Sequence, residues 1–220
     1  MFARALKLLY ANWQIIVPGL VAGGLSALVA AILHPAAQEN DLAASVLVYS
    51  GDALQLIASI VSIAYTTGMA QAAWERGDAN FADGFRAFAR DGSHVFVAMI
   101  GMFVAGLLAV WVSQYTFGLG LALYVFFFIY TMPAAVAGEE RGLQAMLQSA
   151  RLALRRPAAT AGMVLLLAVI VVGITLLSGL LWAAPLVGPL LAALLGQALI
   201  GYLTLVTVGE YLALRPALSA

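Results

Sequence analysis

The basic residues of this sequence all fall on one side of a series of long apolar stretches. Six stretches are long enough to cross a bilayer, roughly residues 13–33, 44–73, 93–113, 117–138, 158–182 and 186–212. If the chain starts inside the cell, every basic residue lies inside: Arg4, Lys7, Arg76, Arg86, Arg90, Arg141, Arg151, Arg155, Arg156 and Arg215. Connections rich in Lys and Arg stay on the cytoplasmic side of a membrane. The sequence therefore predicts six spans with both termini in the cytoplasm.

Composition excludes a soluble domain. Hydrophobic residues make up 64% of the chain and charged residues 9%, whereas soluble domains have about 45–50% and about 25%. Spans of about 20 residues each leave only short connections, so we expect residues 1–220 to form one integral domain of a prokaryotic inner membrane. The first apolar stretch follows Arg4 and Lys7 as in a signal peptide, but it exceeds the usual ~7–15 residues. We interpret it as a retained span.

The tryptophans support the same span boundaries. Trp13 and Trp74 fall at predicted inner edges, and Trp111 and Trp182 fall at predicted outer edges. Indole rings prefer the headgroup level of a bilayer. The apolar runs are continuous, whereas a transmembrane barrel has alternating segments of about 10 residues. The predicted fold is therefore all-α, a polytopic six-transmembrane-helix bundle.

Amphipathic segments precede the first, third and fifth spans. Their apolar residues recur at helical spacing: Phe2, Leu6, Leu9 and Trp13; Phe81, Phe85 and Phe88; Leu143, Leu147, Ala150 and Leu154. Such helices lie in the plane of the membrane surface. Seven basic residues of these segments would face anionic lipid: Arg4, Lys7, Arg86, Arg90, Arg151, Arg155 and Arg156. We expect three interfacial helices on the cytoplasmic side.

This layout suggests an internal repeat. Each unit would contain an interfacial helix, an outward span, a short outer turn and an inward span, over residues 1–74, 80–138 and 139–214. Residue identity between the units is low, so the repeat would be one of layout. The alternative is that amphipathic linkers commonly form where a cytoplasmic loop meets a bilayer.

The third unit carries a family resemblance. It contains Met132-Pro133, Glu139-Glu140, Gln148-Ser149-Ala150-Arg151-Leu152 and Arg155-Arg156-Pro157. This order resembles the membrane domain fused to some bacterial glycerophosphodiester phosphodiesterases. With Gly77-Asp78 and Phe81-Ala82-Asp83-Gly84, it is also similar to uncharacterised six-helix prokaryotic membrane proteins. The resemblance covers residues 68–92 and 131–167, and it transfers no catalytic residue because the phosphodiesterase chemistry belongs to a soluble domain.

Polar residues form a stripe in the second span. Asp52, Gln55, Ser59, Ser62 and Thr66 follow steps of three and four, which places them on one helix face. Asp52 falls at the predicted outer rim, where water can reach it. The stripe fits either hydrogen bonding between helices or the polar lining of a transport path. Gln197, Thr204 and Thr207 of the last span are placed to meet it.

Small residues recur every four positions in two spans. Gly19 and Gly23 lie in the first span, and Gly188, Ala192 and Gly196 lie in the last. This interval lets helix backbones approach closely. We expect these positions to pack helices, within the chain or against a second copy.

No motif predicts an enzyme. The sequence has no cysteine, and no nucleophile, metal or phosphate-loop motif occurs. His34 and His94 fall on opposite membrane faces, so they cannot share a metal. We expect no catalytic residue, cofactor, metal or nucleic-acid partner.

Two function classes remain. The first is a non-catalytic structural or accessory subunit that binds the bilayer and associates with itself or with a larger membrane complex. The second is a small transporter or lipid-handling protein with a polar cavity beside the second span.

Overall fold

The chain is a helical assembly throughout the part that the computed structural model describes, which is residues 1–33, 42–138, 141–181 and 187–214. Every regular element in these ranges is a helix, so the all-α prediction is confirmed. The elements are α1 (Phe2–Ala11), the 3-10 turn η1 (Trp13–Ile16), α2 (Val17–Leu33), α3 (Leu42–Arg76), α4 (Phe81–Tyr115), α5 (Leu119–Phe128), α6 (Thr131–Ala137), α7 (Leu143–Arg155), α8 (Pro157–Leu181) and α9 (Val187–Leu214).

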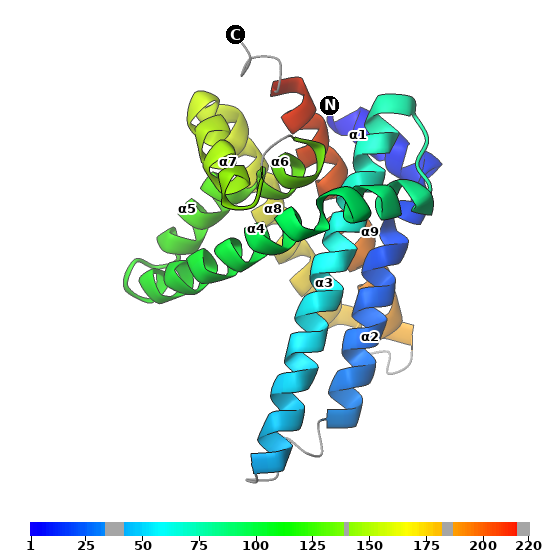
Figure 1. The fold of residues 1–220 in the computed structure, drawn as a ribbon, viewed down its shortest axis with the longest axis vertical. Coiled ribbons are helices and arrows are strands. Elements are labelled where there is room, and N and C mark those ends of the chain that lie inside the picture. The colour runs from blue at the N-terminus through cyan, green and yellow to red at the C-terminus, as the bar shows by residue number, and fades with distance from the viewer. Residues whose placement is uncertain (34–41, 139–140, 182–186, 215–220) are drawn as a thin grey trace.

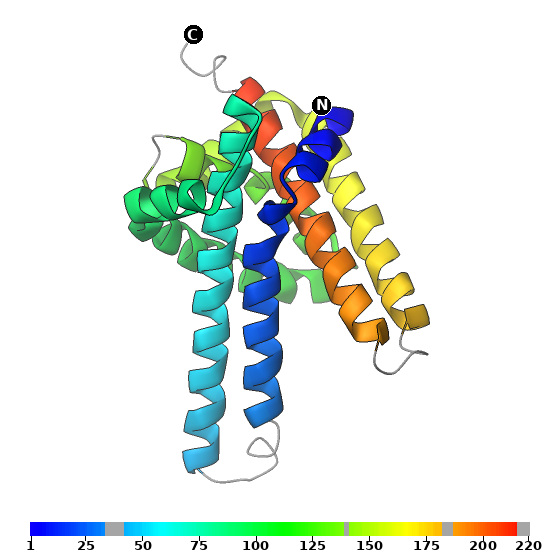
Figure 2. The ribbon, with the colours of Figure 1, turned by 90° about the vertical axis from the view of Figure 1, so that its right-hand side faces the viewer.

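The long helices form three neighbouring pairs. Figures 1 and 2 show α2 beside α3 along the long axis of the molecule, and α8 beside α9. Helix α4 instead crosses α3 at a steep angle, and α5 lies beside α4 (Figure 1). Helix α1, the α3–α4 turn with the first turns of α4, α7 and the last turn of α9 lie toward the same end. We name it the basic end, because the described basic residues lie on α1, on or next to α7, and on the segments next to the α3–α4 turn.

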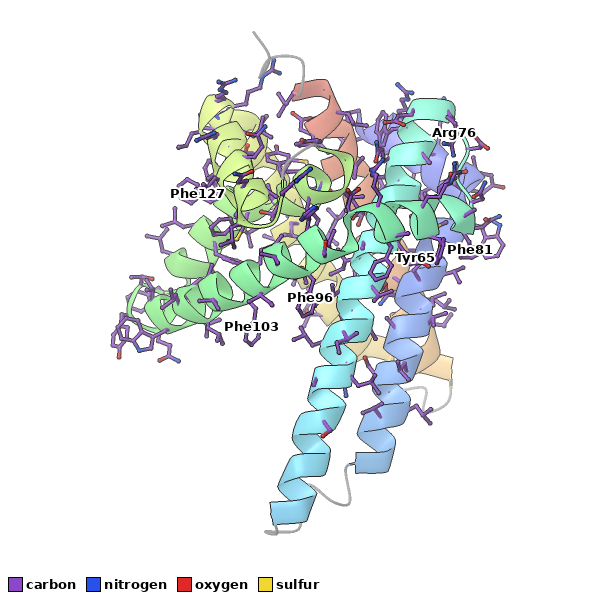
Figure 3. All side chains as sticks on the ribbon, viewed as in Figure 1. Tyr65, Arg76, Phe81, Phe96, Phe103 and Phe127 are labelled. Carbon is purple, nitrogen blue, oxygen red and sulfur yellow. The ribbon has the colours of Figure 1, made fainter. Side chains whose placement is uncertain are left out.

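Several helices are long and apolar enough to span a membrane. Four segments meet this description singly: Ala53–Arg76, Phe81–Tyr115, Leu119–Ala137 and Leu194–Leu214. Two bent helix pairs bring the candidates to as many as six within the described residues. Only 11% of the most apolar stretch of α4 is buried inside the protein, and Phe96 and Phe103 are exposed on it (Figure 3). Such a surface is typical of a protein surrounded by lipid.

The two bent pairs each join an amphipathic helix to an apolar one. The axis turns by 91° between α1 and the helix beginning at Trp13, and by 108° between α7 and α8. Asn12 and Arg156 leave the helical conformation at these joints. Pro157 begins α8, and the residue before a proline is disfavoured in the helical region. Each amphipathic helix therefore lies nearly perpendicular to the apolar helix that follows it.

The second amphipathic segment has no such joint. Residues 81–92 and the apolar stretch 93–113 form one uninterrupted helix, α4. No proline lies in this helix, and the glycines within it are tolerated at a modest cost. The helix axis therefore does not bend here as it does between α1 and α2 and between α7 and α8. Instead, α4 as a whole is inclined to α3 (Figure 1).

Helix α7 has three faces instead of the two expected from its sequence. Small residues, among them Ala145 and Ser149, are buried against the protein. Leu143, Leu147 and Leu154 are exposed, as are the basic residues near its end. The leucine stripe therefore lies on the outside of the protein and is available to lipid.

The predicted span of residues 117–138 is broken into α5 and α6. At the break, the Tyr130 backbone N–H donates to Ser149 Oγ over 3.1 Å, and Ser149 Oγ donates to the Phe127 carbonyl over 2.7 Å. Non-helical backbone within a membrane is tolerated where its polar groups find partners inside the protein. The buried hydroxyl of Ser149 thus replaces the missing helical hydrogen bonds.

Candidate functional site

The polar stripe of α3 becomes more buried toward the basic end. Gln55 and Ser59 are half-buried, whereas Ser62 and Thr66 are buried. Asp52 lies within α3, but its side chain is outside the described residues. The stripe therefore enters the helix bundle only along the half nearer the basic end.

The half of the stripe nearer the basic end meets α9 at a small cavity. Ser62 and Thr66 line it from α3, and Gln197 and Thr204 line it from α9. The cavity measures about 30 Å³, which is room for one or two waters. Thr204 and Thr207 donate their hydroxyl protons to carbonyls of their own helix. The prediction that Gln197 and Thr204 lie opposite the stripe is thus confirmed, and the space between the stripe and these two residues is narrow.

The predicted packing glycines differ in their surroundings. A Cβ on Gly19 would overlap the side-chain amide of Gln197, and one on Gly23 would make ordinary contact with it. A Cβ on Gly196 would meet no atom within 4 Å in the part of the chain described. The side-chain surroundings of Gly188 and Ala192 lie outside that part. Gly19 thus lies against the Gln197 side chain, whereas Gly196 has no neighbour of this kind in the part of the chain described.

Other glycines, which sequence reasoning did not select, also lie in close contacts between helices. A Cβ on Gly68 of α3 would overlap Ala87 of α4, and one on Gly84 would overlap Tyr65. These two glycines let α4 cross directly over α3. They do not show the four-residue spacing used to select candidates, because one lies on each of the two crossing helices.

A cluster of charged residues lies where α3 turns into α4. Asp83 is buried, with a side-chain exposure of 4%. Its carboxylate accepts from Arg76 Nη2 over 2.7 Å, from Arg86 Nη2, and from the Asn80 backbone N–H over 3.0 Å. The Asn80 side chain in turn accepts from the Asp83 backbone N–H, which completes a capping box. Asp83 therefore fixes both the start of α4 and two guanidinium groups.

Sequence reasoning assigned Arg86 to lipid and did not select Arg76 or Asp83. Two local signals were present: the Asn80-x-x-Asp83 spacing of a capping box and the i, i+3 spacing of Asp83 and Arg86. The link to Arg76 carries no such signal, because it crosses the turn between two helices.

The pKa of the Asp83 carboxyl is lowered. This residue precedes the apolar part of α4, so it lies outside the predicted span. Burial alone would raise its pKa, but the hydrogen bond from the Asn80 backbone and the charges of Arg76 and Arg86 outweigh this effect. The carboxylate therefore stays ionised at neutral pH and holds both arginines.

A cavity of about 180 Å³ opens beside Asp83. Its charged lining comprises Glu75, Arg76, Asp83, Arg86 and Arg90. Arg90 Nη2 donates to the Val136 carbonyl of α6 over 3.0 Å, and its Nε donates to Asp91 over 2.7 Å. Arg90 is therefore held between α4 and α6 at the edge of the cavity.

The remaining basic residues were also predicted to face lipid. The Arg4 guanidinium lies 4.6 Å from the centre of the Trp74 ring and donates to the Trp74 carbonyl. Arg4 thus also joins α1 to α3. Lys7 on α1, Arg151 and Arg155 on α7, and Arg156 just after α7 are exposed. Their contact with lipid stays a prediction.

Helix α1 is also fastened to the α3–α4 turn by Asn12, which is buried. Its side-chain amide donates to the carbonyls of Leu8 and Gly77 and accepts from the Ala79 backbone N–H. These hydrogen bonds give the Gly77 carbonyl and the Ala79 N–H of the turn a partner, and they fix the joint between α1 and α2. No local sequence pattern indicated this role of Asn12.

No known protein family, curated protein or solved structure matches the chain. The resemblance of residues 68–92 and 131–167 therefore stays a prediction. Among the residues described, no three His, Cys, Asp or Glu side chains lie close enough together to hold a metal ion. Hydrogen-bonding and charged groups of the described residues gather at two places. One is the small α3–α9 cavity. The other is the cavity beside Asp83 lined by Arg76, Arg86 and Arg90, which we name the arginine cavity.

Proposed function

We propose that the protein is a non-catalytic subunit of the prokaryotic inner membrane, with six spans, both termini in the cytoplasm and a structural or accessory role. The orientation is supported by the basic end, which gathers α1, the α3–α4 turn and α7 (Figure 1). Arg76 lies toward this end above the first turns of α4, whereas Phe81 and Tyr65 lie below them (Figure 3). Near the start of α4, the charged end of α3 thus lies nearer the basic end than the aromatic rings do, as expected where helices meet a membrane surface.

The near-perpendicular joints support an interfacial position for α1 and α7. If α2 and α8 cross the membrane, helices turned by 91° and 108° from them lie close to its plane. Both helices expose large apolar side chains, such as Leu6 on α1 and Leu147 on α7. Burying such residues at the acyl boundary is favourable by about 25 cal/mol per Å² of apolar surface. Lipid binding thus accounts for apolar faces that the protein leaves uncovered.

The observation that carries the non-transport interpretation is the narrow α3–α9 cavity. A transport path needs a polar space that admits its substrate, whereas the space that Ser62 and Thr66 share with α9 measures about 30 Å³. Polar side chains that meet across helices contribute roughly 0.6 kcal/mol each to helix association. The stripe therefore fits packing better than conduction.

Cysteine accessibility tests this proposal, and the natural chain has no cysteine to remove. Ser62→Cys and Thr66→Cys variants would be treated with a membrane-impermeant maleimide from each side. We expect labelling at least about 100-fold slower than for Lys7→Cys on exposed α1, because a buried thiol is inaccessible and reluctant to ionise. Rapid labelling of either cysteine from one side would favour the transporter alternative.

Association with a second copy or another membrane protein is tested by cross-linking. Phe103 is exposed on α4, and Ala98 of the same helix is buried. We expect a Phe103→Cys variant, oxidised in its native membrane, to form a discrete covalent dimer or a thiol adduct with one partner. Ala98→Cys serves as the matched control and should form none. A monomer with both variants would contradict an accessory role through this face.

A further inference from the structure

The arginine cavity is built on a floor of small residues. Gly68 and Ala72 of α3 and Ala87 of α4 line it beneath the charged side chains. Because a Cβ on Gly68 would overlap Ala87, the helices are as close here as they can be. The space of about 180 Å³ is many times the room that one water needs. The cavity therefore exists because the side chains at the helix crossing are short, whereas the charged side chains that line it are long.

The guanidinium groups around the cavity are held in place. Asp83 pairs with both Arg76 and Arg86, and it is buried with an exposure of 4%, so its oxygens are engaged on the protein side. The side chains of Arg76 and Arg86 remain 46% and 69% exposed. An arginine offers five donors in a planar fork, so fixing one edge leaves the other directed outward. Preorganised donors of this kind bind anions at low entropic cost.

What the lining offers an anion is hydrogen-bond donors rather than net charge. It carries three positive charges, on Arg76, Arg86 and Arg90, and two negative ones, on Glu75 and Asp83, and Asp91 adds a third carboxylate 2.7 Å from Arg90 Nε. The Glu75 carboxylate accepts a hydrogen bond of 2.8 Å from Gln71, so it is already engaged at the cavity wall. Each of these carboxylates thus accepts from the protein, and the guanidinium groups have further donors to offer.

We propose that this cavity binds a phosphate group, with Arg86 and Arg90 as its principal ligands and Arg76 completing the rim. Arginine forks match the oxygens of phosphate in a bidentate manner. A phosphate carries more charge and more acceptor oxygens than a carboxylate, which suits three guanidinium groups around one space. The phosphate comes either from a lipid headgroup or from a soluble phosphate, and both present the same chemistry to the arginines.

The test uses the full-length protein in nanodiscs and follows thermal unfolding by tryptophan fluorescence. One arm adds inorganic phosphate to phosphatidylcholine nanodiscs at constant ionic strength. The other arm replaces phosphatidylcholine by phosphatidylglycerol without added phosphate. We expect stabilisation in at least one arm, since a ligand that binds only the folded state raises its unfolding temperature. Stabilisation by inorganic phosphate indicates a soluble source, and stabilisation by phosphatidylglycerol alone indicates a lipid.

Matched variants assign the effect to the cavity. An R86Q/R90Q variant should weaken apparent phosphate affinity at least tenfold, or abolish the response to phosphatidylglycerol. A K7Q/R151Q variant removes the same charge from the same end but outside the cavity, and should respond like the natural protein. The single R90Q variant leaves the Asp83 pairs intact, so it separates weakened binding from weakened folding.

The proposal is overturned if neither arm stabilises the natural protein. It is also overturned if R86Q/R90Q and K7Q/R151Q lose the response equally, because the effect would then be general surface charge. Equal stabilisation by acetate at the same concentration would likewise exclude a phosphate site.

Discussion

An Asp83→Asn variant should lose about 2–3 kcal/mol of its free energy of unfolding at pH 7. Removing one partner of a buried ion pair costs about 3–5 kcal/mol, and the exposed guanidinium groups of Arg76 and Arg86 reduce this figure through solvent screening. The asparagine keeps an oxygen for the Asn80 backbone N–H but cannot balance two cations. The loss would be measured by reversible unfolding in mixed micelles with increasing dodecyl sulfate.

The pH dependence of this difference follows from the lowered pKa of Asp83. In the unfolded chain the pKa is about 3.9, so the stabilisation is fully present above that value. It decreases as the pH falls through the lower folded pKa, because the carboxyl then becomes neutral. The stability gap should be equal at pH 7 and pH 5 and should narrow below about pH 4. Asp78→Asn, on an exposed neighbour that lies 3.7 Å from Arg76, should change little. A gap that stayed constant at low pH would contradict a charge effect.

A Gly209→Leu variant should be destabilised by about 3 kcal/mol, at the upper end of the usual range for overpacking. A Cβ on Gly209 would overlap the indole ring of Trp74. This ring is fixed from two directions, since its Nε1–H donates to the Leu205 carbonyl over 2.6 Å and the Arg4 guanidinium lies on its face. The indole cannot move aside without breaking these contacts, so α3 and α9 must separate.

Gly196→Leu is the matched control in the same helix. Its new side chain would meet no neighbouring atom within 4 Å among the described residues. Both substitutions gain the same helix propensity, about 0.8 kcal/mol over glycine, so the difference between their unfolding free energies isolates the overlap with Trp74. Equal stability of the two variants would show that the α3–α9 contact adapts freely.

Much of the helical structure could be predicted from the sequence. All six apolar stretches consist mostly of helix where they are described, and the amphipathic segments at α1 and α7 were expected as separate helices. Local patterns suffice for this, because apolar periodicity and proline act within one or two helical turns. The same patterns did not reveal the break between α5 and α6, which depends on a serine nineteen residues away in sequence from Tyr130.

The candidate site was predictable only in part. The stripe on α3 follows from helical spacing, and its contact with Gln197 and Thr204 was anticipated. The assignment of Arg86 to lipid alone missed its pairing with Asp83. The hydrogen bond from Trp74 to the Leu205 carbonyl and the hydrogen bonds between Asn12 and the α3–α4 turn join residues far apart in the chain. Such pairs carry no spacing signal, since they depend on how the helices cross.

The sequence by itself determined that the chain is helical and apolar enough for a membrane, and it grouped the basic residues into a few connections. Those properties reside in single segments and in their solvation. Only the tertiary structure decided that Asp83 pairs with both Arg76 and Arg86, that Gly209 leaves room for the Trp74 ring, and that the polar stripe meets α9 across a space of about 30 Å³. The physical reason is that distances between helices depend on crossing angles and on close packing of side chains from distant parts of the chain.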